Sequence, residues 1–313
     1  MKTLQSSGLN YTEHASEIIM QAAALVAAHR PFALITSLAI EGGAAREVGS
    51  LALVDESGEM SGYLSNGCID RDIQLHAAEA LRTGVKKLIR YGDGSRFVDL
   101  KLPCGGALTV LIDPAPDKAA ITRAAAEFAA RQTVSLTFHG PDDAAAGPVT
   151  FTYAPRHRLV LAGRGAIFRA MAQIGQATGY DVYALSPDAA DLAAVRTLID
   201  TEPHQLTAPT AVQSLDMLDR HAAFLTLFHD HDWEPVLLKA ALDTPAHFIG
   251  SLGSRRTHEM RKETLRQMGV PDAALARLRG PIGVVPSLRD ASSIAVSALA
   301  EIVGAFQQMN ADG

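Results

Sequence analysis

The strongest candidates for a chemical role are two cysteines, each next to a glycine. Cys68 lies in Ser65-Asn-Gly-Cys-Ile-Asp70, and Cys104 lies in Leu102-Pro-Cys-Gly-Gly106. A structural cysteine usually has bulky neighbours, whereas glycines permit close approach of a ligand and expose backbone donors. We therefore predict that both thiols are functional. The glycines expected to contact the same ligand are Gly67, Gly105 and Gly106.

The spacing of these cysteines excludes other uses of the thiols. They are 36 residues apart, and the chain contains no Cys-x-x-Cys pair. Neither a disulfide framework nor a structural zinc site is supported. We expect free thiols in a reducing compartment.

A glycine turn follows the apolar run 159–162. Gly163-Arg164-Gly165 joins this run to a helical segment, which is the placement of a dinucleotide-binding turn. The glycines let the backbone approach a diphosphate, whose charge meets the N–H groups of the helix. Phe168 replaces the third glycine, so we expect looser packing of the helix, and Ser186 ends the next strand where NAD binding needs an acidic residue. We predict diphosphate binding but not NAD(P); alternatively, the glycines serve only the turn.

A second anion site is predicted in the segment 250–257. An apolar strand enters a Gly/Ser loop that contains Ser254, and a helix then begins with Arg255 and Arg256. Positive charge in the first helical turn opposes the helix dipole unless an anion compensates, and arginine matches phosphate oxygens. The alternative is that both arginines are solvated on a surface helix.

Two histidines follow a predicted strand at the carboxyl edge of a parallel sheet. His229 and His231 are two residues apart, so on an extended chain they share a face. A metal site would need a third ligand from elsewhere. We favour hydrogen bonds from these histidines to a ligand or within the loop, and keep a metal as the alternative.

The residues named so far are predicted to lie in two α/β domains. Residues 1–115 are predicted to be a mixed α+β domain, with helices over 15–30 and 70–83. A connecting helix and hairpin are predicted over 116–155. From residue 156, short apolar runs alternate with alanine-rich helical segments, which is typical of a Rossmann-like, doubly wound parallel sheet extending to residue 313.

Composition restricts the class of protein. The chain has 313 residues and a formal net charge of −6, from 28 Lys plus Arg against 34 Asp plus Glu, which disfavours nucleic-acid binding. No apolar run reaches membrane-spanning length, and the N-terminus lacks a secretory apolar region. We predict a cytoplasmic protein that acts on neither nucleic acid nor membrane.

Several segments together resemble the XdhC/CoxI family, over nearly the whole chain. In the first domain the segments are Gly43-Ala-Ala-Arg-Glu-Val-Gly49, Ser65-Asn-Gly-Cys68-Ile-Asp and Pro103-Cys-Gly-Gly106. In the second they are Gly163-Arg-Gly165, His229-Asp-His-Asp, Ile249-Gly-Ser-Leu-Gly-Ser-Arg-Arg-Thr257, Gly280-Pro-Ile-Gly283 and Ala295-Val-Ser-Ala-Leu-Ala-Glu-Ile302. Their order makes the resemblance more specific than any one glycine motif.

The resemblance implies a cytoplasmic homodimer that matures molybdenum hydroxylases. Such a protein binds molybdenum cofactor, as molybdopterin or its dinucleotide form, and assists its sulfuration with a cysteine desulfurase. It then delivers the product to an apo-enzyme of the xanthine dehydrogenase type, acting as a carrier more than as an enzyme. Since molybdenum is thiophilic, Cys104 is the candidate to ligate the metal or to lie beside it during transfer, with Cys68 as the second candidate.

Two other functions are weighed against this one. The first is an NAD(P)-dependent oxidoreductase that uses the Rossmann-like domain, with His229 or His231 as acid and base. The second is a nucleotide-sensing protein in which the cysteines are incidental. The carrier hypothesis expects both thiols to converge with the phosphate-binding residues on a single pterin.

Overall fold

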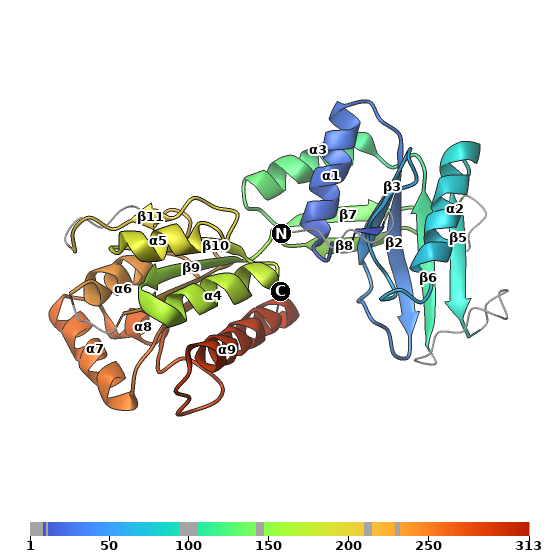
Figure 1. Ribbon diagram of the computed structural model, residues 1–313. Helices are drawn as coiled ribbons and strands as arrows, with labels where there is room; N and C mark the ends of the chain where they lie inside the picture. Colours follow the sequence, from blue (N-terminus) through green and yellow to red (C-terminus); the bar gives the residue numbers. More distant parts are fainter. Residues whose placement is uncertain are drawn as a thin grey trace. The chain divides into compact units, whose positions relative to one another are not determined.

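The structure is a computed structural model that describes residues 9–10, 12–93, 106–141, 147–209, 215–228 and 232–312. The chain divides after Pro155 into two compact units, called here the N-terminal unit and the C-terminal unit. Each unit has its own sheet covered by helices (Figure 1). Within the described ranges, no helix combines the length and the apolar character that crossing a membrane requires.

The N-terminal unit is built on a six-stranded sheet in the order β1-β4-β3-β2-β6-β5. The strands pair antiparallel except for β1 and β4, which are parallel. Their bounds are β1 Leu9–Asn10, β2 Phe32–Glu41, β3 Leu51–Asp55, β4 Met60–Gly62, β5 Lys87–Gly92 and β6 Ala107–Asp113. The mixed α+β organisation predicted for this part is therefore present.

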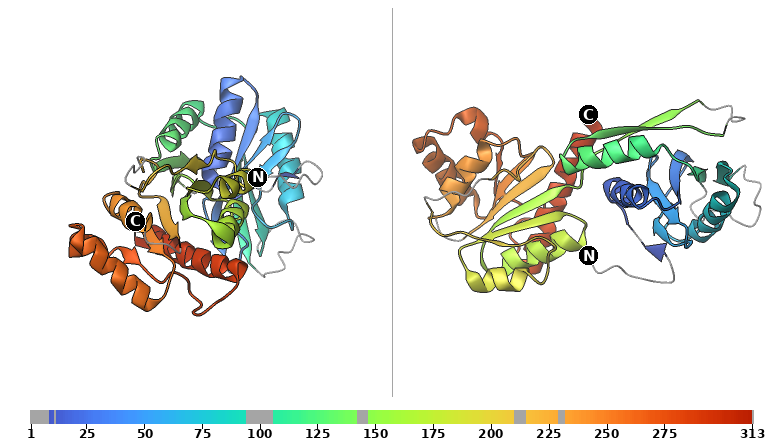
Figure 2. Two further views of the ribbon diagram at one scale, coloured as in Figure 1. Left: turned by 60° about the vertical axis from the view of Figure 1, so that its left-hand side comes forward. Right: turned by 90° about the horizontal axis from the view of Figure 1, so that it is seen from above.

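Helices cover both faces of this sheet. Along β2, Ala33 and Ile35 point to one face, which is covered by α2 (Asp70–Thr83), and Phe32 and Leu34 point to the other. That second face is covered by α1, by α3 and by the β7–β8 hairpin, with α1 beside α3 (Figures 1 and 2). The bounds are α1 Ala15–Ala27, α3 Lys118–Ala129, β7 Val134–Phe138 and β8 Val149–Tyr153.

The segment expected to be a connector contributes to this core. Ile121 and Phe128 of α3 are buried in the same cluster as Val134 and Leu136 of β7 and Ile18 of α1. A connector would leave its apolar residues exposed. Here the helix and the hairpin close one face of the sheet, because that face would otherwise expose alternate residues of β2 and β3 to water.

The C-terminal unit is a parallel, doubly wound sheet in the order β11-β10-β9-β12-β13-β14. This is the order of the dinucleotide-binding fold, with its switch point between β9 and β12. The Rossmann-like prediction is confirmed. The strands are β9 Arg158–Gly163, β10 Asp181–Ser186, β11 His204–Gln205, β12 Ala222–Leu227, β13 Phe248–Ser251 and β14 Leu278–Arg279.

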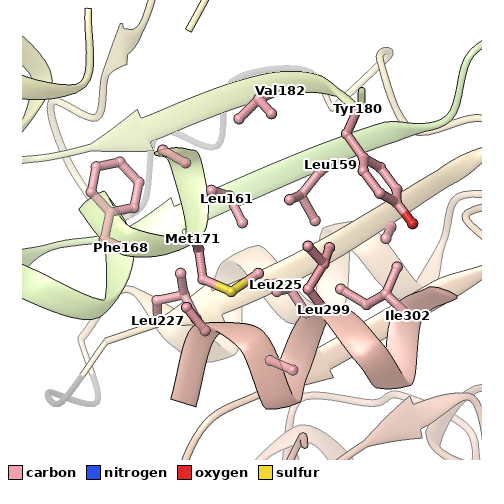
Figure 3. Packing of buried hydrophobic residues seen from close by; sticks show 14 of the residues in the cluster. Leu159, Leu161, Phe168, Met171, Tyr180, Val182, Leu225, Leu227, Leu299 and Ile302 are labelled. Carbon is pink, nitrogen blue, oxygen red and sulfur yellow. The ribbon is translucent and has the colours of Figure 1, made fainter. Parts of the chain in front are cut away.

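Helices pack on both faces of this sheet as well. The helices α4, α5 and α9 contribute to one buried cluster, and α6, α7 and α8 contribute to the other. Figure 3 shows the first cluster, where side chains of β9, α4 and α9 meet. The bounds are α4 Gly165–Ala177, α5 Ala189–Val195, α6 Glu234–Leu242, α7 Arg255–Gln267, α8 Asp272–Leu275 and α9 Ala291–Asp312.

Close packing of α4 on the sheet is provided by a glycine that sequence reasoning missed. Phe168 is fully buried in the cluster, so the side chain that replaces the expected third glycine fills the core. Seven residues later on the same helix, a Cβ atom at Gly175 would lie 2.5 Å from Leu159 Cδ2 and 3.2 Å from Val182 Cγ2. The helix therefore approaches β9 and β10 closely at Gly175, and not at Phe168.

We expect Gly175→Ala to destabilise the protein. Leu159 and Val182 are fully buried, so their side chains can move away from the added methyl group only by displacing other residues of the core. The overpacking should outweigh the gain in helix propensity, for a net loss of about 1–2 kcal/mol in the free energy of unfolding. The measurement is urea denaturation of the full chain.

Gly304→Ala is the matched control, because Gly304 is also inside a helix but an added Cβ there meets nothing within 4 Å. It should stabilise the protein by up to about 1 kcal/mol. Equal effects of the two substitutions would contradict the packing role of Gly175.

Candidate functional site

The Cys68 thiol is exposed on a loop between β4 and α2. A buried carboxylate, that of Asp70, fixes the backbone of this loop. Asp70 is fully buried, and it accepts hydrogen bonds from the N–H groups of Leu64 (2.7 Å), Ser65 (3.1 Å) and Gly67 (2.6 Å) and from the Ser65 hydroxyl (2.9 Å). Charge-assisted hydrogen bonds of this kind are among the stronger ones in proteins.

The conformation of the loop explains its residue types. Asn66 and Gly67 have φ values of 55° and 100°, which are costly for most side chains and tolerated by asparagine and glycine. The Ser65 hydroxyl also accepts from the N–H of Ile69 at 2.9 Å. The loop thus holds its shape through its own bonds, and the N–H of Gly67 is used inside the loop.

Asp70 belongs to the Cys68 motif, but no role was predicted for it from the sequence. The available signal was an acidic residue at the first position of a helix, three residues after the glycine of an Asn-Gly turn. Carboxylates at helix starts are common because they complement the helix dipole. Burial distinguishes Asp70 from an ordinary acidic first turn, and burial was not readable from the sequence.

An arginine of the family-like segment 43–49 packs against the strand end that leads to this loop. The Arg46 guanidinium lies 4.7 Å from the ring centroid of Tyr63, and its Nη2 donates to the backbone oxygen of Glu13 at 2.5 Å. The Tyr63 hydroxyl donates to the Glu13 carboxylate. Burial, followed by this hydrogen bond to Glu13, raises the pKa of Tyr63. Arg46 and Tyr63 therefore form one cluster in the described part of the N-terminal unit.

The remaining predicted residues of the thiol site are only partly described. Gly106 lies where a Cβ atom would be 2.5 Å from the oxygen of Gly43 and 2.6 Å from that of Glu41, so close backbone packing requires a glycine there. Cys104, Gly105, His229 and His231 lie outside the described residues. The predicted convergence of the thiols with the phosphate-binding residues stays a prediction.

In the C-terminal unit, the glycine turn has the predicted backbone but its donor is occupied. A Cβ atom at Gly163 would lie 2.6 Å from Leu227 Cβ, and Gly165 has a φ of 81°. Arg164 precedes α4 as its N-cap residue. The N–H of Gly165 donates to Asp191 Oδ2 at 2.7 Å, and Arg169 Nε donates to Asp191 Oδ1 at 2.5 Å. A carboxylate of the chain itself thus lies at the N-terminus of α4.

The second predicted anion site lies at the start of α7. Ser254 is the N-cap residue and accepts from the N–H of Thr257 at 3.1 Å. Arg255 and Arg256 occupy the first two helical positions, and both are exposed. Among the residues that the structure describes, neither arginine forms an ion pair. No acidic residue occupies this first turn, so its positive charge is uncompensated there.

A pocket of about 920 Å³ lies beside the start of α7. Arg255 and Thr257 line one part of it, and the segment 281–288 lines another. Ile167 from the first turn of α4 and Phe228 after β12 also reach it. The pocket therefore lies where the carboxyl ends of the central strands meet, which is the ligand-binding edge of such sheets.

A buried ion pair forms the polar part of the pocket wall. Glu234 and Arg261 are about 4% and 3% exposed, and Arg261 Nε lies 2.9 Å from Glu234 Oε2. Arg261 Nη2 donates to Glu234 Oε1 at 3.0 Å and to the Leu252 oxygen at 2.7 Å. Thr226 and Ser251, at the ends of β12 and β13, donate to the same carboxylate. No spacing in the sequence indicated this pair, because its partners lie 27 residues apart on two helices.

His258 is buried one turn into α7, in contact with Gly280. A Cβ atom at Gly280 would lie 2.3 Å from His258 Nδ1. Burial, and then the charges of Lys262 and Arg261, lower the pKa of His258. The imidazole is therefore neutral at pH 7, and the positive charge near the pocket comes from arginine.

Comparisons with known proteins agree with both units. Family models described as the XdhC Rossmann domain and as the XdhC and CoxI family match residues 159–302 and 25–92. The molybdenum cofactor insertion chaperone PaoD of Escherichia coli K12 is 30% identical over 281 residues, which are 86% of this chain and 81% of that protein. Uncharacterized protein YqeB of the same organism is 26% identical, over 91% of this chain and 46% of its own.

A solved structure described as a xanthine dehydrogenase from Bacillus halodurans is similar over 93% of this chain and 96% of that one. The TM-score is 0.74 at 18% sequence identity. At this identity the likeness shows the shared fold.

We expect Asp70→Asn to loosen the Cys68 loop. An amide oxygen accepts more weakly than a carboxylate, and the amide nitrogen cannot accept from the loop donors that bonded to the second carboxylate oxygen. The free energy of unfolding should therefore fall by about 1.5–3 kcal/mol. The rate of Cys68 alkylation, measured in a Cys104→Ser background, should change at the same time because the thiol loses its fixed setting.

Asp72→Asn, on the same helical turn, is the control for this substitution. Asp72 accepts from the Tyr91 hydroxyl at 2.7 Å, and among the described residues it makes no hydrogen bond to the loop. Its alkylation rate should match that of the parent protein. Equal rates in all three proteins would contradict the role assigned to Asp70.

Proposed function

The chain belongs to the XdhC and CoxI family, and from this premise we propose that it binds molybdenum cofactor as cargo and takes part in its insertion into a molybdenum enzyme. The observation that carries the proposal is the 30% identity to the insertion chaperone PaoD, which extends over 86% of the chain and so includes both units. In this role the protein acts as a carrier more than as a stand-alone enzyme.

Cys68 is proposed as a thiol that meets the cargo. Its exposure makes it accessible to a bulky ligand, and the bonds of Asp70 hold the loop in one conformation before the cargo arrives. Soft thiolate ligands suit a thiophilic metal such as molybdenum. Cys104 is proposed as the second thiol, with Gly105 and Gly106 beside it.

The finer assignments follow from the same family relationship. We propose that the cargo is molybdopterin or its dinucleotide form, that a cysteine desulfurase supplies sulfur to it, and that the recipient is a xanthine dehydrogenase-type apo-enzyme. A cytoplasmic homodimer is proposed as the working form. The mildly acidic chain does not oppose an anionic cargo, because recognition depends on local donors and arginines.

The oxidoreductase alternative is weakened by Asp191. Binding of a dinucleotide at the glycine turn needs the N–H of Gly165, and that group already donates to Asp191 at 2.7 Å. A diphosphate at the same place would face a carboxylate. This contact supports the expectation that NAD(P) is not the ligand.

The proposal is tested by purifying the protein from cells that synthesise molybdenum cofactor. We expect bound molybdenum and the fluorescence of oxidised pterin in the purified protein. Cys68→Ser removes the sulfur but keeps the size of the side chain, and it should lower the molybdenum content at least about tenfold, as loss of a metal contact does.

Ser57→Ala, in an exposed turn of the same unit, is the control and should leave the molybdenum content unchanged. The folded fraction of each variant is checked by circular dichroism. Purified protein without molybdenum and pterin, or full retention by both Cys68→Ser and Cys104→Ser, would sink the proposal.

A further inference from the structure

Three long helices of this protein begin at candidate sites, and their first turns are not equally available to a ligand. At α2, the buried carboxylate of Asp70 accepts from the loop just before the helix. At α4, Asp191 is about 3% exposed and accepts from Gly165, and Arg169 neutralises it. Both places therefore already hold an anion supplied by the chain.

The start of α7 differs because it holds only a neutral cap. The Ser254 hydroxyl satisfies the N–H of Thr257, which leaves the N–H groups of Arg255 and Arg256 without an intrahelical acceptor. The two guanidinium groups add positive charge to the positive end of the helix dipole. An anionic ligand at this end would remove that repulsion.

A second observation at this place points to a missing acceptor. The Arg261 side chain is about 97% buried in the pocket wall, and Glu234 and Leu252 accept from its Nη2. Its Nη1 nitrogen is buried and has no hydrogen-bond partner in the described residues. A buried donor without an acceptor is costly, so an acceptor brought by a ligand would stabilise the complex.

Another part of the pocket lining is apolar and held in place by hydrogen bonds. Val284 and Val285 are 58% and 52% exposed although both line the pocket. Backbone N–H groups attach their segment to α9: Gly283 donates to Glu301 Oε2 at 2.6 Å, and Val284 and Val285 donate to the backbone oxygen and the Oγ of Ser297 at 3.3 and 2.8 Å. An apolar wall held in place in this way suits the flat body of a heterocycle.

We propose that this pocket is the phosphate subsite of the C-terminal unit, and that it takes a phosphate ester of a planar heterocycle. Arg255 and the first N–H groups of α7 hold the phosphate, Arg261 supplies the buried donor, and Val284 and Val285 contact the ring. Because Asp191 already accepts from the N–H of Gly165 at α4, the anion binds at the start of α7. The inference rests on the proposed function for the identity of the natural ligand, a phosphorylated pterin.

The probe for this inference is flavin mononucleotide, with riboflavin as the same ring without phosphate. Flavin fluorescence is titrated with the full-length protein. We expect tighter binding of flavin mononucleotide than of riboflavin. Arg255→Gln should weaken flavin mononucleotide binding about tenfold, the equivalent of one charge-assisted hydrogen bond, and leave riboflavin binding unchanged.

Arg256→Gln is the matched control, because it removes the same charge from the next residue of the same helix, which does not line the pocket. Its effect should be less than about twofold, as for a screened surface charge.

Three results would overturn the inference: no saturable binding of flavin mononucleotide, equal binding of riboflavin, or equal losses in the two arginine variants. If the pocket fails these tests while the purified protein retains molybdenum, the inference falls and the proposed function stands. If Arg255→Gln has the expected effect in a protein that never retains molybdenum, the pocket stands and the proposed function falls.

Discussion

The candidate sites of this protein depend on one requirement. Backbone N–H groups in loops and at helix starts need a hydrogen-bond acceptor. These groups have no partner within their own helix, and they attract negative charge. Asp70 meets the need before α2, and Asp191 meets it at α4. At α7 only the hydroxyl of Ser254 is present, next to two exposed arginines. A carboxylate of the chain therefore lies at the starts of α2 and α4, and an anionic ligand would meet no such carboxylate at the start of α7.

The two internal carboxylates have different consequences. Asp70 gives the loop of Cys68 a fixed shape while leaving the thiol exposed. Asp191 occupies the N–H of Gly165, a donor that usually faces a diphosphate in this fold. The C-terminal unit thus keeps the Rossmann-like architecture although this donor already has an acceptor within the chain.

Both units bury their sheets in the same way, but the reasons for particular residues differ. In the N-terminal unit, alternate residues of β2 face α2 or the pair α1 and α3, so the hairpin β7–β8 is needed to complete the second face. In the C-terminal unit, close approach of α4 depends on Gly175, while Phe168 fills the space between helix and sheet. A residue that departs from a motif is therefore compensated elsewhere on the same helix face.

The class of fold, the bounds of α2 and the family could all be predicted from the sequence, because periodicity and ordered motifs are local properties of the chain. It also indicated Ser254, Arg255 and the glycine turn as candidates. Three features became visible only in the folded chain: Asp191 accepts from the N–H of Gly165, Asp70 is buried, and Glu234 pairs with Arg261. These contacts join residues of separate elements, and burial determines their strength; neither the distance between two side chains nor their burial is encoded in any local pattern.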